Sequence, residues 1–314
     1  MNDKGPFPTA LDFGGPQIAG YDGVGSGYRV WVPSWVDSSV RPGFFRGYGQ
    51  TTPPEWNASP DSISLVIPAY NEGERLEKSL TEYLPVLEAL GVPYEVIVIA
   101  DGSDHTPEVA RKYGARGVRC YTYPDKLGRG GAILEGFRKS RFELIAFADA
   151  DGSVPGADFK QMARLALGGM PAVVASRRLE PKMVSVPEPP LRRSVGFVWA
   201  TLVKLVLGVQ LEDSQCGLKV FSRSVVQDVI LRRLTVTNRT FEVAMMFHVA
   251  RAGIPVCEFP VRYVHDFDSR MPIAKAVPVM FLTLMGVALA NMLEVRGLKP
   301  PKFIVGLNSR FAAV

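Results

Sequence analysis

Residues 144–152 read Leu-Ile-Ala-Phe-Ala-Asp-Ala-Asp-Gly, an apolar run that ends in two carboxylates, Asp149 and Asp151. Such a run before a turn is typical of a strand that is buried on both faces. Carboxylate oxygens suit Mg²⁺ or Mn²⁺, which proteins usually hold with one or two carboxylates and the phosphates of a substrate. The stretch therefore predicts a strand that ends in a site for a metal and a diphosphate. The alternative is a solvated acidic turn.

Two further apolar runs, residues 63–67 and 95–100, end in the same way. The first leads into Pro68-Ala69-Tyr70-Asn71-Glu72 and the second into Asp101. Helix-like sequence follows each run, so strands and helices alternate. This order predicts an α/β protein with a mostly parallel sheet and helices on both faces, in which ligands bind beyond the carboxyl ends of the strands. The polar residues at these strand ends would then meet in one crevice.

The helix after the first strand has a local start signal. Leucines recur at helical spacing over residues 76–87, and Asn71 and Glu74 are arranged like a capping box. We therefore expect Asn71 to cap this helix.

The chain resembles the family 2 glycosyltransferases of GT-A fold in five segments that occur in the family's order. They are SLVIPAYNE at 64–72, VIADGSDHT at 98–106, GRGGA at 128–132, FADADGS at 147–153 and DSQCGLKVF at 213–221. The last segment resembles dolichyl-phosphate glucosyltransferases and mannosyltransferases. The resemblance implies a GT-A fold, with a Rossmann-like, mostly parallel sheet. It also implies a nucleotide-diphosphate sugar as donor, Mg²⁺ or Mn²⁺ as cofactor and a polyprenyl phosphate lipid as acceptor.

For the donor, the resemblance assigns residues by position. The residues that would contact the base and ribose are Pro68, Ala69, Tyr70, Glu72 and Asp101. Those that would bind the diphosphate and the metal are Asp149, Ala150 and Asp151. Ala100 precedes Asp101 where the family usually has a second acid, which leaves the base open. Alternatively, Tyr70 is a packed aromatic and Asp101 an Asx-turn residue.

Residues 127–132 form a glycine-rich loop that is a poor dinucleotide fingerprint. The third glycine of that motif would fall at Ile133, and the loop does not follow a strand directly. By resemblance, Arg129 lies at the start of a helix over 132–139, where a cation and free N–H groups favour an anion. The alternative is a flexible turn.

Acceptor residues are also implied by resemblance. Arg177 and Arg192 would lie near the acceptor phosphate, although a solvated basic helix end is equally consistent with them. Asp213 and Gln215 would form the floor of the acceptor site, and Asp213 matches a catalytic base of many related transferases. A phosphomonoester has its second pKa near ~6, however, so it needs no base at neutral pH. Asp213 would then orient the sugar or hold neighbouring basic residues.

Two further charged residues match family segments. Glu242 lies in an acidic segment in which Ala244 replaces the usual glutamate, so it is a catalytic candidate without an assigned role. Arg270 matches a basic residue near the diphosphate and would stabilise the departing nucleoside diphosphate.

Charge indicates an anionic partner. The 314 residues carry a formal net charge of +5, and residues 175–240 hold 11 Lys or Arg against 5 Asp or Glu. A nucleotide, a lipid phosphate or an anionic membrane surface would suit this excess, whereas no nucleic-acid-binding motif accompanies it. The cysteines do not form a C-x-x-C pattern, which favours a reduced, cytoplasmic compartment.

The ends of the chain differ from the catalytic domain, which we place at residues 61–272. Residues 1–60 contain 10 Gly, 8 Pro and ten aromatics, and predict an arm that docks on its own domain or on a neighbouring subunit of a homo-oligomer. Residues 273–314 are expected to form a hydrophobic helix and tail. Residues 276–293 carry no charge and are near the lower limit for a membrane span. They could be a buried core helix, a surface or dimerisation helix, or a span, and the resemblance favours peripheral attachment to the cytoplasmic face of a membrane.

The sequence thus predicts an inverting, metal-dependent glycosyltransferase, with glucose from UDP-glucose as the favoured donor on resemblance. One alternative is the same donor chemistry with a soluble or glycolipid hydroxyl acceptor. The other is a non-catalytic binding or assembly protein that retains the fold.

Overall fold

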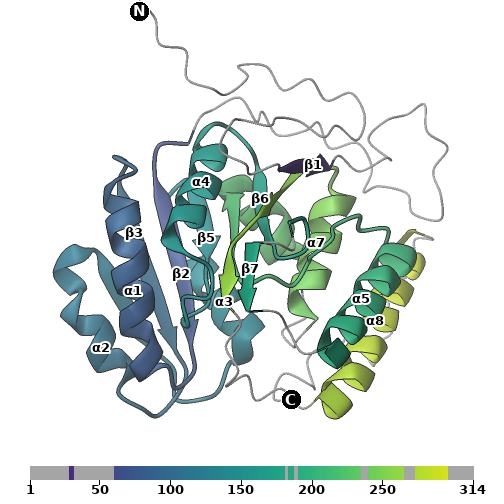
Figure 1. Cartoon of the computed structure of the whole chain (residues 1–314), viewed down its shortest axis with the longest axis horizontal. Coiled ribbons are helices and arrows are strands. Elements are labelled where there is room, and N and C mark those ends of the chain that lie inside the picture. Colours follow the sequence, from purple (N-terminus) through teal and green to yellow (C-terminus); the bar gives the residue numbers. More distant parts are fainter. Residues whose placement is uncertain are drawn as a thin grey trace, which may run out of the picture.

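An eight-stranded mixed sheet runs through the middle of the protein (Figure 1). The computed structural model describes residues 28–31, 60–180, 183–186, 190–234, 240–264 and 273–295. The strands of the sheet are β1 (Arg29–Trp31), β2 (Ile63–Ala69), β3 (Tyr94–Ala100), β4 (Val118–Thr122), β5 (Leu144–Phe147), β6 (Ala172–Ser176), β8 (Lys219–Ser222) and β9 (Val256–Pro260). A separate pair consists of β7 (Val184–Val186) and β10 (Tyr263–Val264).

The order across the sheet is β1-β9-β6-β8-β5-β2-β3-β4. Strands β4, β3, β2 and β5 are parallel to their neighbours in this group, and β6 is parallel to β9. Strand β8 is antiparallel to both β5 and β6, and so joins the two parallel groups. The predicted mostly parallel α/β sheet is confirmed, and β8 and β1 are antiparallel members that the sequence did not reveal.

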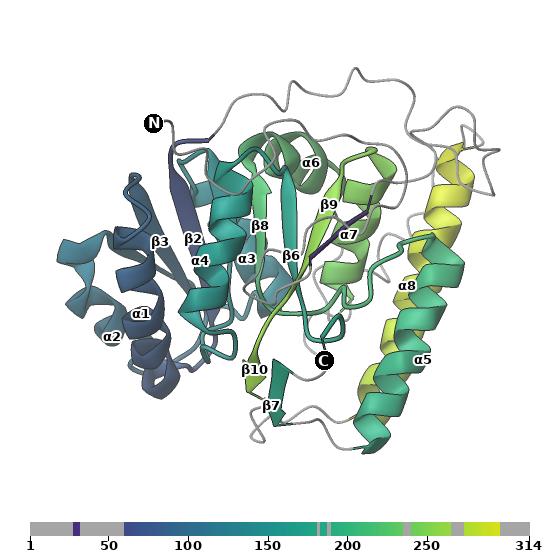
Figure 2. The same ribbon diagram turned by 45° about the horizontal axis from the view of Figure 1, so that its top comes forward.

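Helices cover both faces, as predicted (Figures 1 and 2). They are α1 (Gly73–Glu88), α2 (Thr106–Lys112), α3 (Gly128–Lys139), α4 (Gly156–Leu167), α5 (Pro190–Leu207), α6 (Leu231–Arg233), α7 (Phe241–Arg251) and α8 (Ile273–Val295), with the 3-10 helix η1 (Gly114–Arg116) and the π-helix η3 (Val225–Ile230). Leu80 of α1 and Phe159 of α4 pack into one core cluster, and Phe137 of α3 and Phe247 of α7 pack into the other. Each cluster lies between the sheet and one helical layer.

The predicted capping box of α1 is wrong. Glu72 is at the N-cap position and makes no side-chain capping bond. Instead, the N–H of Gly73 donates to Oδ2 of Asp104, at 2.9 Å, in the loop after β3. Asn71 adopts a left-handed conformation (φ 55°), and its Oδ1 accepts the N–H of Ser103 at 2.9 Å. The group that caps α1 therefore comes from a segment distant in sequence. It connects the loops that follow the neighbouring strands β2 and β3.

Strand β1 is the described part of the N-terminal arm. It pairs antiparallel with β9, with Arg29 opposite Glu258 and Trp31 opposite Val256. Trp31 is buried in the core cluster that contains α3 and α7. This part of the arm docks on its own catalytic domain, while residues 1–27 and 32–59 lie outside the described residues.

Helix α8 packs along α5 (Figure 2). Leu284 and Val287 face the core, whereas Phe281, Leu282 and Leu289 are exposed. The helix is therefore half-buried rather than a fully buried core helix. None of the helices in the described part of the chain combines the length and the apolarity needed to cross a membrane.

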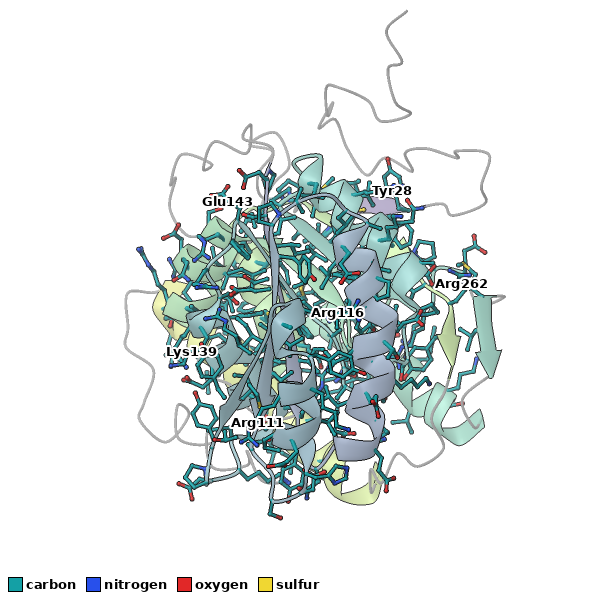
Figure 3. All side chains as sticks on the ribbon, turned by 90° about the vertical axis from the view of Figure 1, so that its left-hand side faces the viewer. Tyr28, Arg111, Arg116, Lys139, Glu143 and Arg262 are labelled. Carbon is teal, nitrogen blue, oxygen red and sulfur yellow. The ribbon has the colours of Figure 1, made fainter. Side chains whose placement is uncertain are left out.

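Ion pairs on the outer surface contribute little to this fold. Arg116 pairs with Glu88 at 2.8 Å and Arg111 pairs with Glu108 at 2.9 Å. Figure 3 shows both arginines on the side of the molecule where α1 and α2 lie. Because water screens such exposed pairs, they add little to the stability of the fold.

In contrast to these exposed pairs, one carboxylate at the amino ends of the strands is buried. Glu95, at the start of β3, is only 2% exposed. It accepts bonds from Oγ of Ser64 at 2.7 Å, from N and Nε of Arg141 at 2.8 and 3.1 Å, and from Arg119. Burial alone would raise the pKa of Glu95, but these donors outweigh it and lower the pKa. Glu95 therefore joins β2, β3, β4 and the start of β5 at the edge opposite the site.

We predict that Glu95→Gln lowers the free energy of unfolding by about 1–2 kcal/mol at pH 7, because hydrogen bonds to a charged acceptor are lost and the arginines are partly solvated. The folded-state pKa lies below the unfolded value of about 4.3, so this stabilisation is full above that pH and is lost as the pH falls through the folded-state pKa. Urea denaturation at pH 7 and pH 3.5 measures the difference. An effect of equal size at both values would contradict the ionic explanation.

Candidate functional site

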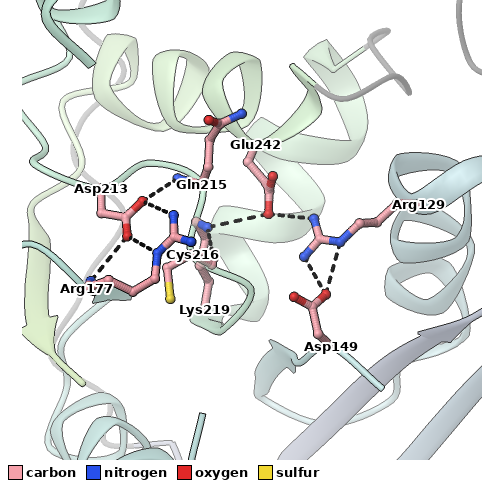
Figure 4. Close-up of polar contacts among 8 residues, drawn as sticks. All are labelled: Arg129, Asp149, Arg177, Asp213, Gln215, Cys216, Lys219 and Glu242. Carbon is pink, nitrogen blue, oxygen red and sulfur yellow. Dashed lines mark hydrogen bonds and ion pairs between the residues drawn. The ribbon is translucent and has the colours of Figure 1, made fainter. Parts of the chain in front are cut away.

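Arg129 bridges two acidic residues at the carboxyl ends of the strands (Figure 4). Its Nε and Nη2 donate to Oδ1 of Asp149 at 3.0 and 2.6 Å, and its Nη1 donates to Oε1 of Glu242 at 2.5 Å. Arg129 lies in the first turn of α3, Asp149 follows β5, and Glu242 begins α7. Burial alone would lower the pKa of Arg129, but the two carboxylates raise it. The side chains from three elements thus form one electrostatic unit.

Negative charge is concentrated around Asp149. Burial, followed by the charge of Asp149, raises the pKa of Asp151, although its Oδ1 also accepts the N–H of Ser153 at 2.9 Å. The pKa of Glu72 is raised by burial and by both aspartates, against the opposing effect of Arg75. Crowded carboxylates of this kind favour an additional cation. The donor set of Asp149 and Asp151 therefore fits Mg²⁺ or Mn²⁺.

Protein side chains alone do not complete a metal site here. Among the described residues, no group of three or more His, Cys, Asp or Glu side chains could hold a metal ion. Ions such as Mg²⁺ are commonly held by one or two carboxylates with substrate phosphates and water. The two aspartates would therefore hold such an ion together with a diphosphate.

The loop over residues 213–217 lies directly against Asp149. A Cβ atom at Gly217 would be only 1.8 Å from Oδ2 of Asp149, which is far inside van der Waals contact. A side chain at position 217 would therefore force this carboxylate to move. The segment that resembles the acceptor loop is thereby fixed beside the metal-binding candidates.

Asp213 forms a buried pair with Arg177, which follows β6. Asp213 is 3% exposed; its Oδ2 accepts the N–H and Nε of Arg177 at 3.2 and 2.6 Å, and its Oδ1 accepts Nη2 at 3.0 Å. The N–H of Gln215 also donates to Oδ1, at 3.2 Å. Burial alone would raise the pKa of Asp213, but Arg177 holds it well below its usual range. Asp213 is therefore ionised and is a weak proton acceptor.

Lys219 contacts Glu242 and the loop that contains Asp213, and was not among the predicted site residues. It is fully buried at the start of β8, and its Nζ donates to the carbonyl of Cys216 at 2.7 Å. The same atom lies 3.9 Å from Oε1 of Glu242 and 5.4 Å from the ring centre of Phe147. Burial lowers the pKa of Lys219. A lysine within the apolar run 218–221 was the available sequence signal.

Asp101 holds the start of α3. Its Oδ2 accepts the N–H groups of Leu127 and Gly128 at 2.8 and 3.1 Å, and its side chain is buried. Burial raises the pKa of Asp101. Helix α3 begins at Gly128 and not at Ala132 as predicted, because this carboxylate caps the glycine-rich turn.

The remaining donor candidates lie at the end of β2 and after β5. Tyr70 is 46% exposed, and Nζ of Lys126 lies 4.1 Å from its ring centre. Ala69 and Ala150 are buried, while Pro68 is partly exposed. The exposed ring of Tyr70 is thus available for stacking once Lys126 moves aside.

Two predicted residues cannot be placed in this geometry. Arg192 lies in α5, but its side chain is not among those that the structure describes, and Arg270 lies outside the described residues. The other predicted residues come from segments far apart in sequence and gather at the carboxyl edge of the sheet. Their catalytic and binding roles stay predictions.

Comparisons with known proteins agree with this architecture. Residues 64–230 match the model of the family described as glycosyl transferase family 2. Dolichyl-phosphate beta-glucosyltransferase of Homo sapiens is 31% identical over 72% of this chain and 74% of its own length; that of Drosophila melanogaster is 32% identical over 67% and 69%. Glycosyltransferase AglD of Haloferax volcanii is 32% identical over 68% of this chain, which spans only 35% of AglD.

Solved structures with the same fold are more distant in sequence. Glucosyl-3-phosphoglycerate synthase from Mycobacterium tuberculosis in complex with UDP has a TM-score of 0.52 at 18% identity and covers 76% of this chain and 81% of its own. The same enzyme with Mn²⁺, UDP-glucose and phosphoglyceric acid has a TM-score of 0.51 at 18% identity, and covers 76% and 80%. At this identity the likeness concerns the fold.

We predict that Asp213→Asn lowers the free energy of unfolding at pH 7 by about 3 kcal/mol, because Arg177 loses its buried anion. The folded-state pKa of Asp213 lies below the unfolded value of about 3.9, so the stabilisation is full above about pH 4 and is lost on further acidification. Urea denaturation between pH 3 and pH 7 measures the loss of unfolding free energy at pH 7 and its decrease at lower pH. The matched control is Asp228→Asn, which removes the exposed pair with Arg232 and should cost at most about 1 kcal/mol. Equal losses in the two variants would refute the buried-pair account.

Proposed function

This chain belongs to glycosyl transferase family 2, and on that premise we propose that it moves one sugar from a nucleoside diphosphate to a polyprenyl phosphate, with inversion at the anomeric carbon. The relatives of about 30% identity are named for dolichyl phosphate as acceptor, which supports this acceptor class. The observation that carries the proposal is the Asp213–Arg177 pair, in which the carboxylate is held in its ionised form.

The state of Asp213 favours an acceptor that has no proton to lose. A phosphate oxygen of the lipid attacks the anomeric carbon, and the bond from that carbon to the diphosphate oxygen breaks on the opposite side. Because the acceptor is already anionic near neutral pH, no base is required. A hydroxyl acceptor would need one, and a carboxylate with a strongly lowered pKa removes protons poorly. In this mechanism Asp213 orients Arg177, and Arg177 meets the acceptor phosphate.

The donor diphosphate lies between Asp149, Asp151 and Arg129 in the proposed complex. A bound Mg²⁺ or Mn²⁺ would neutralise charge on the leaving diphosphate. Arg129 donates two bonds to Oδ1 of Asp149, so its guanidinium lies beside the proposed position of the diphosphate. Arg270 remains our candidate for stabilising the departing nucleoside diphosphate. Glucose from UDP-glucose is the proposed donor, because the curated relatives are named glucosyltransferases.

An exposed apolar surface supports peripheral attachment to a membrane. Within the part of the chain that the structure describes, every exposed large apolar side chain except Tyr70 lies on α5 or α8. They are Phe197, Val198 and Leu205 on α5, and Phe281, Leu282, Leu289 and Met292 on α8. Contiguous apolar groups on a soluble surface usually mark an interaction site. We place this surface at the headgroup level of the cytoplasmic face, where a polyprenyl phosphate would be accessible.

We expect product formation from UDP-glucose and polyprenyl phosphate with Mg²⁺ or Mn²⁺, detected by mass, and none from the matched polyprenol. Asp151→Ala should reduce transfer at least about 10²-fold, because the metal and diphosphate lose a ligand. Asp228→Ala, which removes an exposed acid of η3 that pairs with Arg232, should retain activity.

Transfer to polyprenol at a comparable rate would favour a hydroxyl acceptor. Full activity of Asp151→Ala would contradict the metal assignment. Absence of turnover across a panel of nucleotide sugars and acceptors would favour a non-catalytic binding protein.

We expect the protein to float with vesicles that contain anionic lipid, and the double variant Phe197→Ser with Leu205→Ser to float markedly less. These side chains are 71% and 74% exposed, so their replacement should leave the unfolding temperature nearly unchanged. Ala115→Ser, at an exposed position in η1, is the control and should float like the unaltered protein. Flotation that is insensitive to the double variant would exclude α5 as the attachment surface.

A further inference from the structure

Glu258 is a buried carboxylate in the middle of β9 that neither the family segments nor the proposed chemistry accounts for. Its side chain is fully buried. Each of its oxygens accepts one of two consecutive backbone N–H groups: Oε1 that of Asp213 at 2.9 Å, and Oε2 that of Glu212 at 3.2 Å. Glu258 therefore fixes the backbone immediately before the Asp213 side chain.

The side chain of Glu212 is held from two further elements. Nη1 of Arg29, in β1, lies 3.2 Å from Oε1 of Glu212, and Nζ of Lys204, in α5, lies 2.7 Å from the same atom. Arg29 is also directly opposite Glu258 in the β1–β9 ladder. The segment at residues 212–213 is thus held through its backbone by β9 and through a side chain by β1 and α5.

The position of Arg177 also depends on β9. Strand β6 pairs parallel with β9, with Ser176 opposite Pro260, and Arg177 follows Ser176 directly. Both partners of the Asp213–Arg177 pair are therefore positioned from β9. A small shift of this strand relative to residues 212–213 would move the carboxylate away from the guanidinium.

We propose that β1 and β9 form a brace that positions Asp213 toward Arg177, with Glu258 as the positioning residue through which the brace acts. The proposal rests on the proposed function in assigning Asp213 to the transfer site. A buried carboxylate is costly, and an apolar side chain of similar size would serve packing better. The two N–H bonds explain why an acid stands here. Both β1 and β9 lie outside residues 64–230, which match the family model, so the two strands of the brace come from segments of this chain beyond that match.

The first test needs no substrate. In Glu258→Gln, one side-chain atom becomes a donor and cannot accept the second N–H, so we expect the amides of residues 212 and 213 to exchange hydrogen for deuterium about 10-fold faster or more. Glu95→Gln, which alters a buried acid at the opposite edge of the sheet, is the matched control and should not change exchange there. Unchanged protection in Glu258→Gln would overturn the proposal. Should this variant fail to fold, the same measurement on Arg29→Ala decides it.

The second test separates positioning from stability. We expect Arg29→Ala and Glu212→Gln to raise KM for the acceptor or lower kcat about 3–10-fold with KM for the donor unchanged, and Arg29→Lys to recover most of the loss. Glu95→Gln should not change the kinetic constants for the acceptor relative to those for the donor. Equal changes for donor and acceptor, or none at all, would refute the brace. If the unaltered protein transfers no sugar to polyprenyl phosphate, the proposed function fails, while the exchange measurement still decides the brace.

Discussion

The approach of Gly217 to the Asp149 carboxylate is the constraint on which the arrangement of the site depends. It brings a loop that belongs to the second half of the sheet against a residue that ends the first half. Without a side chain at position 217, the loop can lie close enough for Lys219, two residues later, to come within 3.9 Å of Glu242. The proposed donor and acceptor sides therefore adjoin one another, because the backbone at Gly217 lies against the side chain of Asp149.

Charges of opposite sign alternate through the site from Asp149 to Arg129, Glu242 and Lys219 (Figure 4). Glu242 and Lys219 are buried, and burying charges costs desolvation energy that mutual attraction recovers only when the geometry is good. The more important property of this row of charges is that the two inner members, Arg129 and Glu242, each have a charge of opposite sign on both sides. A phosphate or a metal that enters next to Asp149 would change the partners of Arg129 and, through Glu242, the surroundings of Lys219.

The parts of this structure that follow from local pattern could be predicted from the sequence. Apolar runs gave the strands, and the polar residues at their ends gave Asp101, Asp149 and Asp151 as edge residues. The parts that depend on distant partners could not. Asp104 caps α1 from 31 residues away, and Glu258 accepts the N–H of Asp213 from 45 residues away. Lys219 and Glu258 left one local trace, a single charge in an apolar strand, which is informative because an unpaired charge would not be stable there.

Strand β1 has one more consequence, which concerns association between molecules. Without β1, β9 would be the edge strand on that side of the sheet and would present a row of free N–H and C=O groups. An exposed edge of this kind pairs readily with strands of other chains. Strand β1 replaces this edge with one of only three residues, and very short edge strands pair poorly with other chains. A protein shortened at its N-terminus would therefore carry a longer and more adhesive edge.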